Sequence, residues 1–194
     1  MAKTQRRAPL VTPLKRTAIL VTDLPGSLRF YRDGFGMKVW VQGEAGDELP
    51  PIFRLLGLPI GRVRWVILQS GDVDWGMVGL FELTRPAPAR DRHRRLDRVN
   101  RGEACLVFHS QDVAAVHRLA RRLRLRVLCP PTLLPIAGHG VLSKEMTLRD
   151  PNGVLVNVIQ NLRGGAIGLS NRFPGLKKPL SARRSGASSR GRSE

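Results

Sequence analysis

The sequence feature that most constrains the fold is the tetrapeptide Asp150-Pro-Asn-Gly, which lies between two apolar runs. Proline presets φ at the first central position of a tight turn, and asparagine and glycine accept positive φ after it. The runs on both sides alternate in polarity, as strands do. We therefore predict a β-hairpin over residues 144–160.

The second strand of this hairpin has one polar side chain on an otherwise apolar face. Strand alternation divides its side chains into two sets, Val154, Val156 and Val158 against Leu155, Asn157 and Ile159. An amide on an apolar face needs a hydrogen-bonding partner, or a cavity in which a ligand supplies one. The face that carries Asn157 is therefore predicted to line a cavity.

The chain is predicted to contain two halves with the same order of elements. The first half has a strand at 16–22, a helix capped by Ser27 and ended by Gly34 and Gly36, a strand at 37–41, an inserted loop with a turn of helix at 42–61, and strands at 63–69 and 77–83. The second half has a strand at 103–109, a helix at 112–123, a strand at 125–129, a Pro-rich loop and the hairpin. Each half therefore forms a βαβββ module.

This organisation predicts an α+β fold, with the curled sheets of the two modules forming one cleft. We predict a basic N-terminal extension at 1–13, the first module at 14–84, an Arg-rich linker at 85–102, the second module at 103–162 and a basic tail at 163–194. The tail is rich in Gly, Ser and Arg and lacks apolar periodicity. Both ends are therefore expected to be disordered.

The net charge of +18 comes mainly from the ends and the linker. Residues 1–16, 85–101 and 161–194 contain most of the excess arginine and lysine, so the modules are close to neutral. Basic tails bind polyanions weakly and without specificity. Solvated tails that keep the protein soluble are the preferred interpretation.

The sequence predicts a cytoplasmic protein without membrane contact. No apolar run approaches the roughly 20 residues that span a bilayer, and the N-terminus lacks the apolar core of a signal peptide. The two cysteines, Cys105 and Cys129, fit reduced, buried thiols better than a disulfide framework.

Five motifs in a fixed order resemble the vicinal oxygen chelate superfamily, which includes glyoxalase I, extradiol dioxygenases, methylmalonyl-CoA epimerase and bleomycin-resistance proteins. The motifs are Val21-x-Asp-Leu, Ser27-x-x-Phe-Tyr-Arg-Asp, Phe35-Gly-Met-Lys, Leu80-Phe-Glu-Leu-Thr and Asp150-Pro-Asn-Gly. The resemblance covers residues 14–162. It implies paired βαβββ modules around a cleft that holds a divalent metal ion in the metal-using members.

The resemblance places the four metal-ligand positions of the family at Arg16, Glu82, Glu103 and Asn157. Arg16 stands where the family commonly has histidine, and a guanidinium has no lone pair for a metal. Glu82 and Glu103 supply carboxylates, and Asn157 supplies a weak carbonyl donor in place of glutamate. A divalent metal would therefore rest on Glu82 and Glu103.

Strand alternation independently predicts that these four polar side chains face the cleft. The predicted ligand-binding residues are Arg16, Asn157, Cys105, Leu80 and Leu155, and the predicted catalytic residues are Glu82, Glu103 and Arg16. Three interpretations stay open: the two acids bind a metal, one acid with a raised pKa acts as a general base beside Arg16, or the constellation is a structural ion pair next to a binding pocket.

Two functions follow from these alternatives. The first is a glyoxalase-like lyase, isomerase or dioxygenase-type enzyme that acts on a small oxygenated substrate. The second is a metal-free small-molecule binding protein of the bleomycin-resistance type, with Arg16 anchoring the ligand. The cleft can close within one chain or across a homodimer.

Overall fold

The protein was analysed as a computed structural model that describes residues 11, 13–46, 50–55, 57, 61–85, 94–136 and 141–163. The first half contains β1 (Arg16–Val21), α1 (Leu24–Leu28), η1 (Arg29–Gly34), β2 (Lys38–Ala45), α2 (Pro50–Leu55), β3 (Arg62–Gln69) and β4 (Met77–Arg85). The second half contains β5 (Cys105–His109), α3 (Val113–Arg122), β6 (Val127–Ile136), β7 (Val141–Arg149) and β8 (Leu155–Arg163). The sequence-based prediction of an α+β fold is confirmed.

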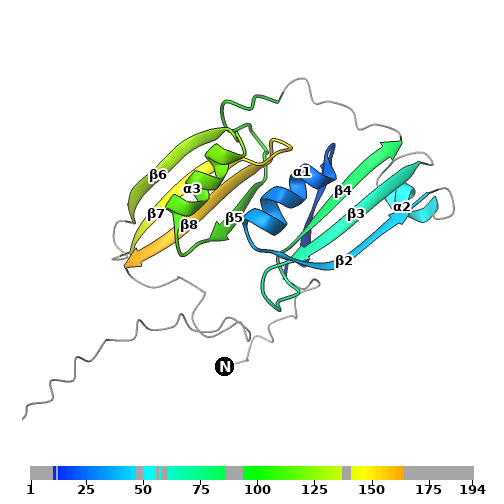
Figure 1. Cartoon of the computed structure of the whole chain (residues 1–194), viewed down its shortest axis with the longest axis horizontal. Helices are drawn as coiled ribbons and strands as arrows, with labels where there is room; N and C mark the ends of the chain where they lie inside the picture. The colour runs from blue at the N-terminus through cyan, green and yellow to red at the C-terminus, as the bar shows by residue number, and fades with distance from the viewer. Residues whose placement is uncertain are drawn as a thin grey trace, which may run out of the picture.

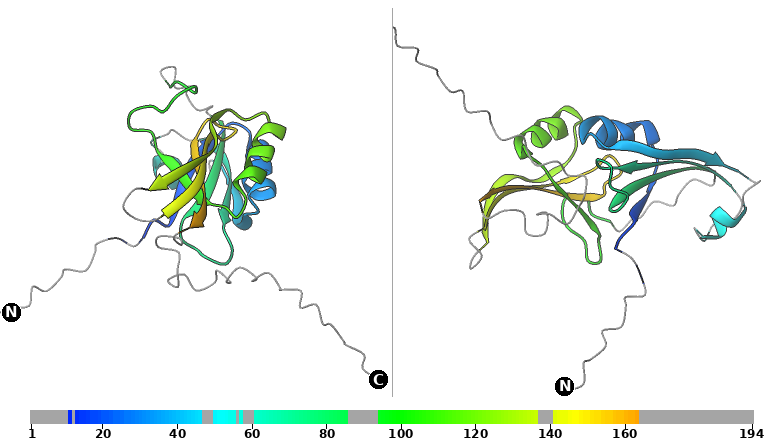
Figure 2. Two further views of the ribbon diagram at one scale, coloured as in Figure 1. Left: turned by 90° about the vertical axis from the view of Figure 1, so that its left-hand side faces the viewer. Right: turned by 90° about the horizontal axis from the view of Figure 1, so that it is seen from below.

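Each half forms one four-stranded mixed sheet, in the orders β1-β4-β3-β2 and β5-β8-β7-β6. In both sheets the first strand pairs in parallel with the last, and the other pairs are antiparallel. The sheets lie side by side, with α1, η1 and α3 covering the same side of both (Figures 1 and 2). We call this side the helix face and the opposite side the open face.

One apolar core runs beneath the helices of both halves. Its buried members from the first sheet include Ile19, Val21, Val66, Leu68, Val78 and Leu80. Those from the second sheet include Met146, Leu148, Val156 and Val158. The predicted orientation of the valines on β8 is therefore confirmed.

A smaller cluster lies on the open face of the first sheet. There Phe53 of α2 packs with Ala45, Val63 and Leu83, and α2 lies on the side of the sheet away from α1 (Figure 2). The insertion after β2 therefore covers one end of the open face.

The two halves are joined by the turn at Asp150 and the helix of the first half. The Tyr31 hydroxyl donates to the buried Asp150 carboxylate at 2.9 Å, and Asn152 Nδ2 donates to Ser27 Oγ at 2.9 Å. Phe35 and Phe108, one from each half, meet edge to face with ring centroids 5.1 Å apart. We call this junction of the two halves the seam.

Two aspartates begin the helices. Asp23 and Asp112 each accept a hydrogen bond from the backbone N–H three residues on, at 2.9 Å, as N-cap residues do. The prediction that Ser27 caps the first helix is wrong. Its hydroxyl lies inside the first turn and donates to the Asp23 carbonyl oxygen instead.

The largest extensions beyond predicted strand ends are in β2 and β6. β2 continues to Ala45, and β6 runs through Pro130, Pro131 and Pro135, which were predicted to form a loop. β6 is an edge strand with two irregularities in its pairing, and such positions tolerate residues without an N–H donor. Most of the N-terminal extension and almost all of the predicted tail lie outside the described residues, so their predicted disorder and the domain boundaries stay predictions.

Candidate functional site

The open face of the first sheet presents two aromatic rings that lie over glycines. A Cβ atom on Gly43 would come within 2.3 Å of the Trp65 ring, and one on Gly79 within 2.8 Å of the Phe81 ring. Trp65 and Phe81 are cross-strand partners and are both half-buried. Glycine therefore lets the rings lie flat along the sheet, where they form an apolar, aromatic surface.

Arg16 lies beside this aromatic surface. It begins β1, it is exposed, and its Cδ would lie 3.7 Å from a Cβ atom on Gly79. Among the described residues Arg16 has no ion-pair partner. Its guanidinium charge is therefore available to an anionic or oxygen-rich ligand on the open face.

Glu82 lies on the helix face, so the prediction that Glu82 and Leu80 face the cleft is wrong. Leu80 is fully buried in the core beneath the helices, and Glu82 follows it on the same face. The Glu82 carboxylate accepts from the Leu24 N–H at 3.1 Å and from Arg64 Nε at 2.9 Å. In this position it stabilises the start of α1 and pairs with a neighbouring strand.

Glu103 is the centre of a buried ionic cluster, which we call the Glu103 cluster. Its carboxylate accepts from both terminal nitrogens of Arg149, from Arg94 Nη2 at 2.9 Å, and from the backbone and side chain of Asn100 at 3.0 Å. The side chains of Arg149 and Glu103 are 2% and 7% exposed. Arg149 also donates to the carbonyl oxygens of Leu96, Arg98 and Gly153, and so attaches the 94–102 segment to the second sheet.

The Glu103 cluster lowers the pKa of its carboxyl group. The hydrogen bond from Arg149, with further bonds from Asn100 and Arg94, holds the pKa of Glu103 well below its ordinary value of 4.5, although burial acts in the opposite direction. A group with a depressed folded-state pKa contributes stability above its unfolded pKa, and that stability is lost as the pH falls toward the folded value.

We therefore expect the free energy of unfolding of the wild type to fall more steeply between pH 5 and pH 2 than that of Glu103→Gln. Urea denaturation at several pH values measures this difference. Asp97→Asn is the comparison variant, because the pKa of Asp97 is also lowered, to about 2, by exposed hydrogen bonds from Arg95 and Arg98. If the free energy of unfolding depended equally weakly on pH in Glu103→Gln and Asp97→Asn, the Glu103 cluster would have no special role in acid stability.

The open face of the second sheet contains the other predicted ligand-binding residues. Asn157 is half-buried, and its Nδ2 donates to Thr147 Oγ1 at 3.4 Å, so the amide has a protein partner. Leu155 is buried, and Cys105 is exposed. The prediction that the Cys105 thiol is buried is wrong, and its predicted role in ligand binding stays a prediction. Partial desolvation nevertheless raises the pKa of Cys105.

A groove of about 670 Å³ lies at the seam, where β1 approaches the start of β5. Its lining combines apolar side chains of β1 with polar groups of the 94–104 segment. Among the lining residues are Ala18, Leu20, Arg94, Arg101 and Glu103. Because Ala18 and Leu20 share a face with Arg16, the groove borders the aromatic surface of the first sheet.

The sequence reasoning missed Arg149 and Phe81 as parts of this region. A charged residue directly before the Asp150 turn was the only signal for Arg149. Gly79 inside a strand was a usable signal for Phe81, because an isolated glycine in a strand often marks the close approach of another group.

The residues at the family's metal-ligand positions do not form a coordination sphere. Glu82 lies on the helix face of the first sheet and Glu103 lies in the segment before β5, and each is hydrogen-bonded to arginine. Within the described residues no group of three or more His, Cys, Asp and Glu side chains is placed to hold a metal ion. The catalytic and metal-binding roles of Glu82, Glu103 and Arg16 stay predictions.

Paired βαβββ sheets, with helices on one side and an open face on the other, define the class of protein. The family model described as "Glyoxalase/Bleomycin resistance protein/Dioxygenase superfamily" matches residues 14–158. The chain belongs to this superfamily, as its motifs predicted.

Solved structures show the same fold at low sequence identity. A glyoxalase family protein from Bacillus cereus has a TM-score of 0.64 at 16% identity and covers 84% of this chain and 100% of its own. A glyoxalase/dioxygenase from Nostoc punctiforme has a TM-score of 0.53 at 14% identity, with the same coverages of 84% and 100%. No curated protein in the comparison matches the chain significantly. No helix among the described residues is long and apolar enough to cross a bilayer.

Proposed function

We propose that this protein binds a small, flat organic anion on the open face of its first sheet, without a metal ion. The proposal rests on the position and exposure of Arg16. It occupies a family metal-ligand position as an exposed cation without an acidic partner among the described residues. The carboxylates at two other ligand positions are neutralised by arginines of the chain itself.

The aromatic surface supports the flat shape of the proposed ligand. The Phe81 ring lies over Gly79, which the Arg16 side chain also approaches, and Trp65 is the partner of Phe81 on β3. The adjoining groove has room for a small molecule. A planar ligand would stack on the rings while its anionic group meets Arg16. This is the metal-free alternative of the two functions that the sequence left open.

Metal analysis separates this function from the enzymatic one. After incubation of the purified protein with Zn²⁺ or Ni²⁺ and exhaustive dialysis, we expect well under one bound equivalent. One equivalent that disappears in Glu82→Ala would overturn the metal-free proposal and favour a lyase or dioxygenase.

Ligand binding is tested with anthraquinone-2-carboxylate and its uncharged amide, followed by tryptophan fluorescence. We expect the carboxylate to bind more tightly than the amide, and Arg16→Gln to weaken it about tenfold while leaving the amide unchanged. Trp65→Leu is expected to weaken both probes about three- to tenfold.

The matched controls are Arg29→Gln, on the helix face, and Trp40→Leu, on the edge strand β2, which should leave both affinities unchanged. If Arg29→Gln weakened the carboxylate as much as Arg16→Gln does, binding would reflect the overall positive charge and the proposed site would be wrong.

A further inference from the structure

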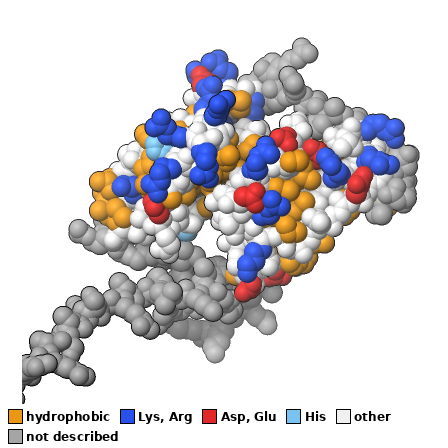
Figure 3. Space-filling view, in the orientation of Figure 1, with side chains coloured by type: hydrophobic (Ala, Val, Ile, Leu, Met, Phe, Trp, Pro, Cys, Tyr) orange, Lys and Arg blue, Asp and Glu red, His pale blue; other side chains and the backbone are white. Residues whose placement is uncertain are grey.

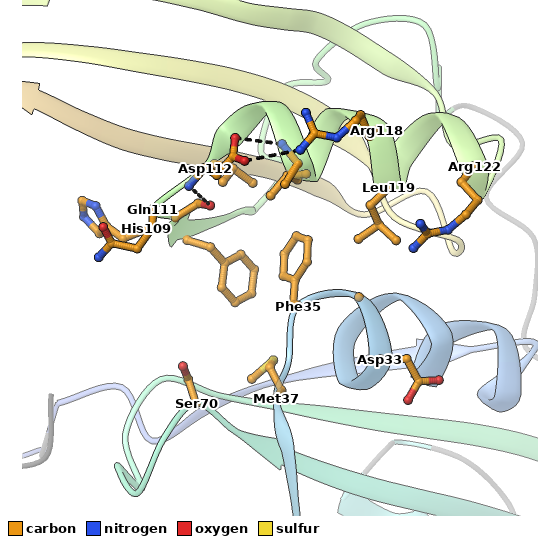
Figure 4. Close-up of a pocket in the computed structure, with 16 residues that line it drawn as sticks. Asp33, Phe35, Met37, Ser70, His109, Gln111, Asp112, Arg118, Leu119 and Arg122 are labelled. Carbon is orange, nitrogen blue, oxygen red and sulfur yellow. Dashed lines mark hydrogen bonds and ion pairs between the residues drawn. The ribbon is translucent and has the colours of Figure 1, made fainter. Parts of the chain in front are cut away.

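A second cavity, of about 480 Å³, lies on the helix face of the seam, between η1 and α3. Partly exposed apolar side chains from both halves form its floor: Phe35, Phe108 and Val116, backed by the buried Met37, Leu119 and Val158. Figure 4 shows Phe35 in the gap between the two helices, with Met37 below it and Leu119 to one side. We call this cavity the interhelical groove.

Close packing at one point holds this groove in shape. A Cβ atom on Gly34 would lie 2.5 Å from Leu119 Cδ2, so the end of η1 meets α3 closely there. The edge-to-face contact of Phe35 with Phe108 fixes the two rings that form the floor. The groove is therefore a preformed cavity with an aromatic floor, on the side of the sheets opposite to Arg16.

The charges at the rim of the groove leave one cation uncompensated. Asp112 caps α3 and pairs with Arg118 at 3.4 Å, and Asp33 pairs with Arg32 at 2.7 Å. Arg122 is exposed and has no ion-pair partner among the described residues. Figure 4 places it at one end of the groove, with His109 and Gln111 at the other.

We propose that the interhelical groove is a second ligand site, which takes a small amphipathic monoanion such as an alkyl carboxylate. The apolar chain lies on Phe35 and Phe108, and the carboxylate receives a charge-assisted hydrogen bond from Arg122. Arg122 is the charged side chain of the lining without an ion-pair partner among the described residues, and it matches one negative charge on the ligand. Because the lining comes from both halves, a bound ligand would also hold them together.

A polyanion is the competing interpretation, since Figure 3 shows Lys and Arg side chains gathered over α3 on the helix face. Arg121 and Arg122 are neighbours on α3 and are both exposed, yet only Arg122 lines the groove. This pair of arginines therefore separates the two interpretations, because a polyanion would use both charges and a ligand in the groove only one.

The experiment titrates full-length protein with decanoate and with uncharged decanamide by calorimetry. We expect decanoate to bind at one site, and Arg122→Glu to weaken it at least tenfold, as the loss of a charge-assisted hydrogen bond does. Arg121→Glu is the matched control and should change the affinity less than twofold. Ala115→Phe, at an exposed position in the lining, should weaken decanoate and decanamide alike by filling the groove.

If Arg121→Glu and Arg122→Glu weakened decanoate binding equally, the proposal would be overturned and a general charge effect would be indicated. Weakening by Trp65→Leu would place decanoate on the open face and would overturn it as well. The failure of the function proposed for the open face leaves this test unaffected, because Arg122 and Arg16 lie on opposite sides of the sheets.

Discussion

Arg149→Leu is expected to lower the free energy of unfolding by about 3–5 kcal/mol, the cost of removing one partner from a buried ion pair. Arg149 is 2% exposed and pairs with Glu103, which would be left buried with less positive charge around it. The carbonyl oxygens of Leu96 and Arg98 would also lose a donor. Urea denaturation followed by circular dichroism measures the change.

Two further variants test the cause of this loss. Arg95→Leu removes an exposed arginine from the same segment, where the solvent-screened pair with Asp97 is expected to contribute little to stability. Glu103→Gln combined with Arg149→Leu should recover part of the stability, because the uncompensated charge is then gone. A double variant as unstable as the sum of the single variants would contradict this account.

Asp150→Ala is expected to destabilise the protein by about 2–4 kcal/mol, because one buried and two partly buried donors lose their acceptor together. The Asp150 carboxylate accepts from the Tyr31 hydroxyl at 2.9 Å and from the N–H groups of Asn152 and Val154 at 2.8 and 2.7 Å. Tyr31 is fully buried, so its hydroxyl would have no access to water. Thermal and chemical denaturation measure the effect.

Tyr31→Phe separates the two roles of Asp150. This variant removes only the hydrogen bond from Tyr31 to Asp150 and leaves the turn intact, so we expect a smaller loss of about 1–2 kcal/mol. If Tyr31→Phe cost as much as Asp150→Ala, the turn bonds would contribute nothing measurable. If Tyr31→Phe cost nothing, the hydroxyl would not contribute to the seam.

The order of elements was predictable because it depends on local chemistry. Proline and glycine mark the Asp150 turn, and one apolar stripe marks the helix that became α3. The motifs Ser27-x-x-Phe-Tyr and Asp150-Pro-Asn-Gly were also recognisable. What they do was not visible in the sequence: Tyr31 bonds to Asp150 and Ser27 to Asn152, across 119 and 125 residues of chain.

The orientation of β4 was not predictable from alternation. The run Met77–Leu83 is apolar at almost every position, so the pattern gives two faces but does not say which one meets the helices. The parallel pairing of β4 with β1 decides it, since Val21 and Ile19 of the core are the partners of Glu82 and Leu80. The Glu82 side chain therefore lies on the helix face, beside these core residues.

The bonds across the seam also set the order in which this chain can become complete during synthesis. Ribosomes add about 5–20 residues per second, so the 119 residues between Tyr31 and Asp150 take about 6–24 s to emerge. Until then the aromatic rings of the nascent first helix have no second half to cover them. The time between the synthesis of Tyr31 and that of Asp150 is therefore the period in which a nascent chain of this kind most depends on chaperones.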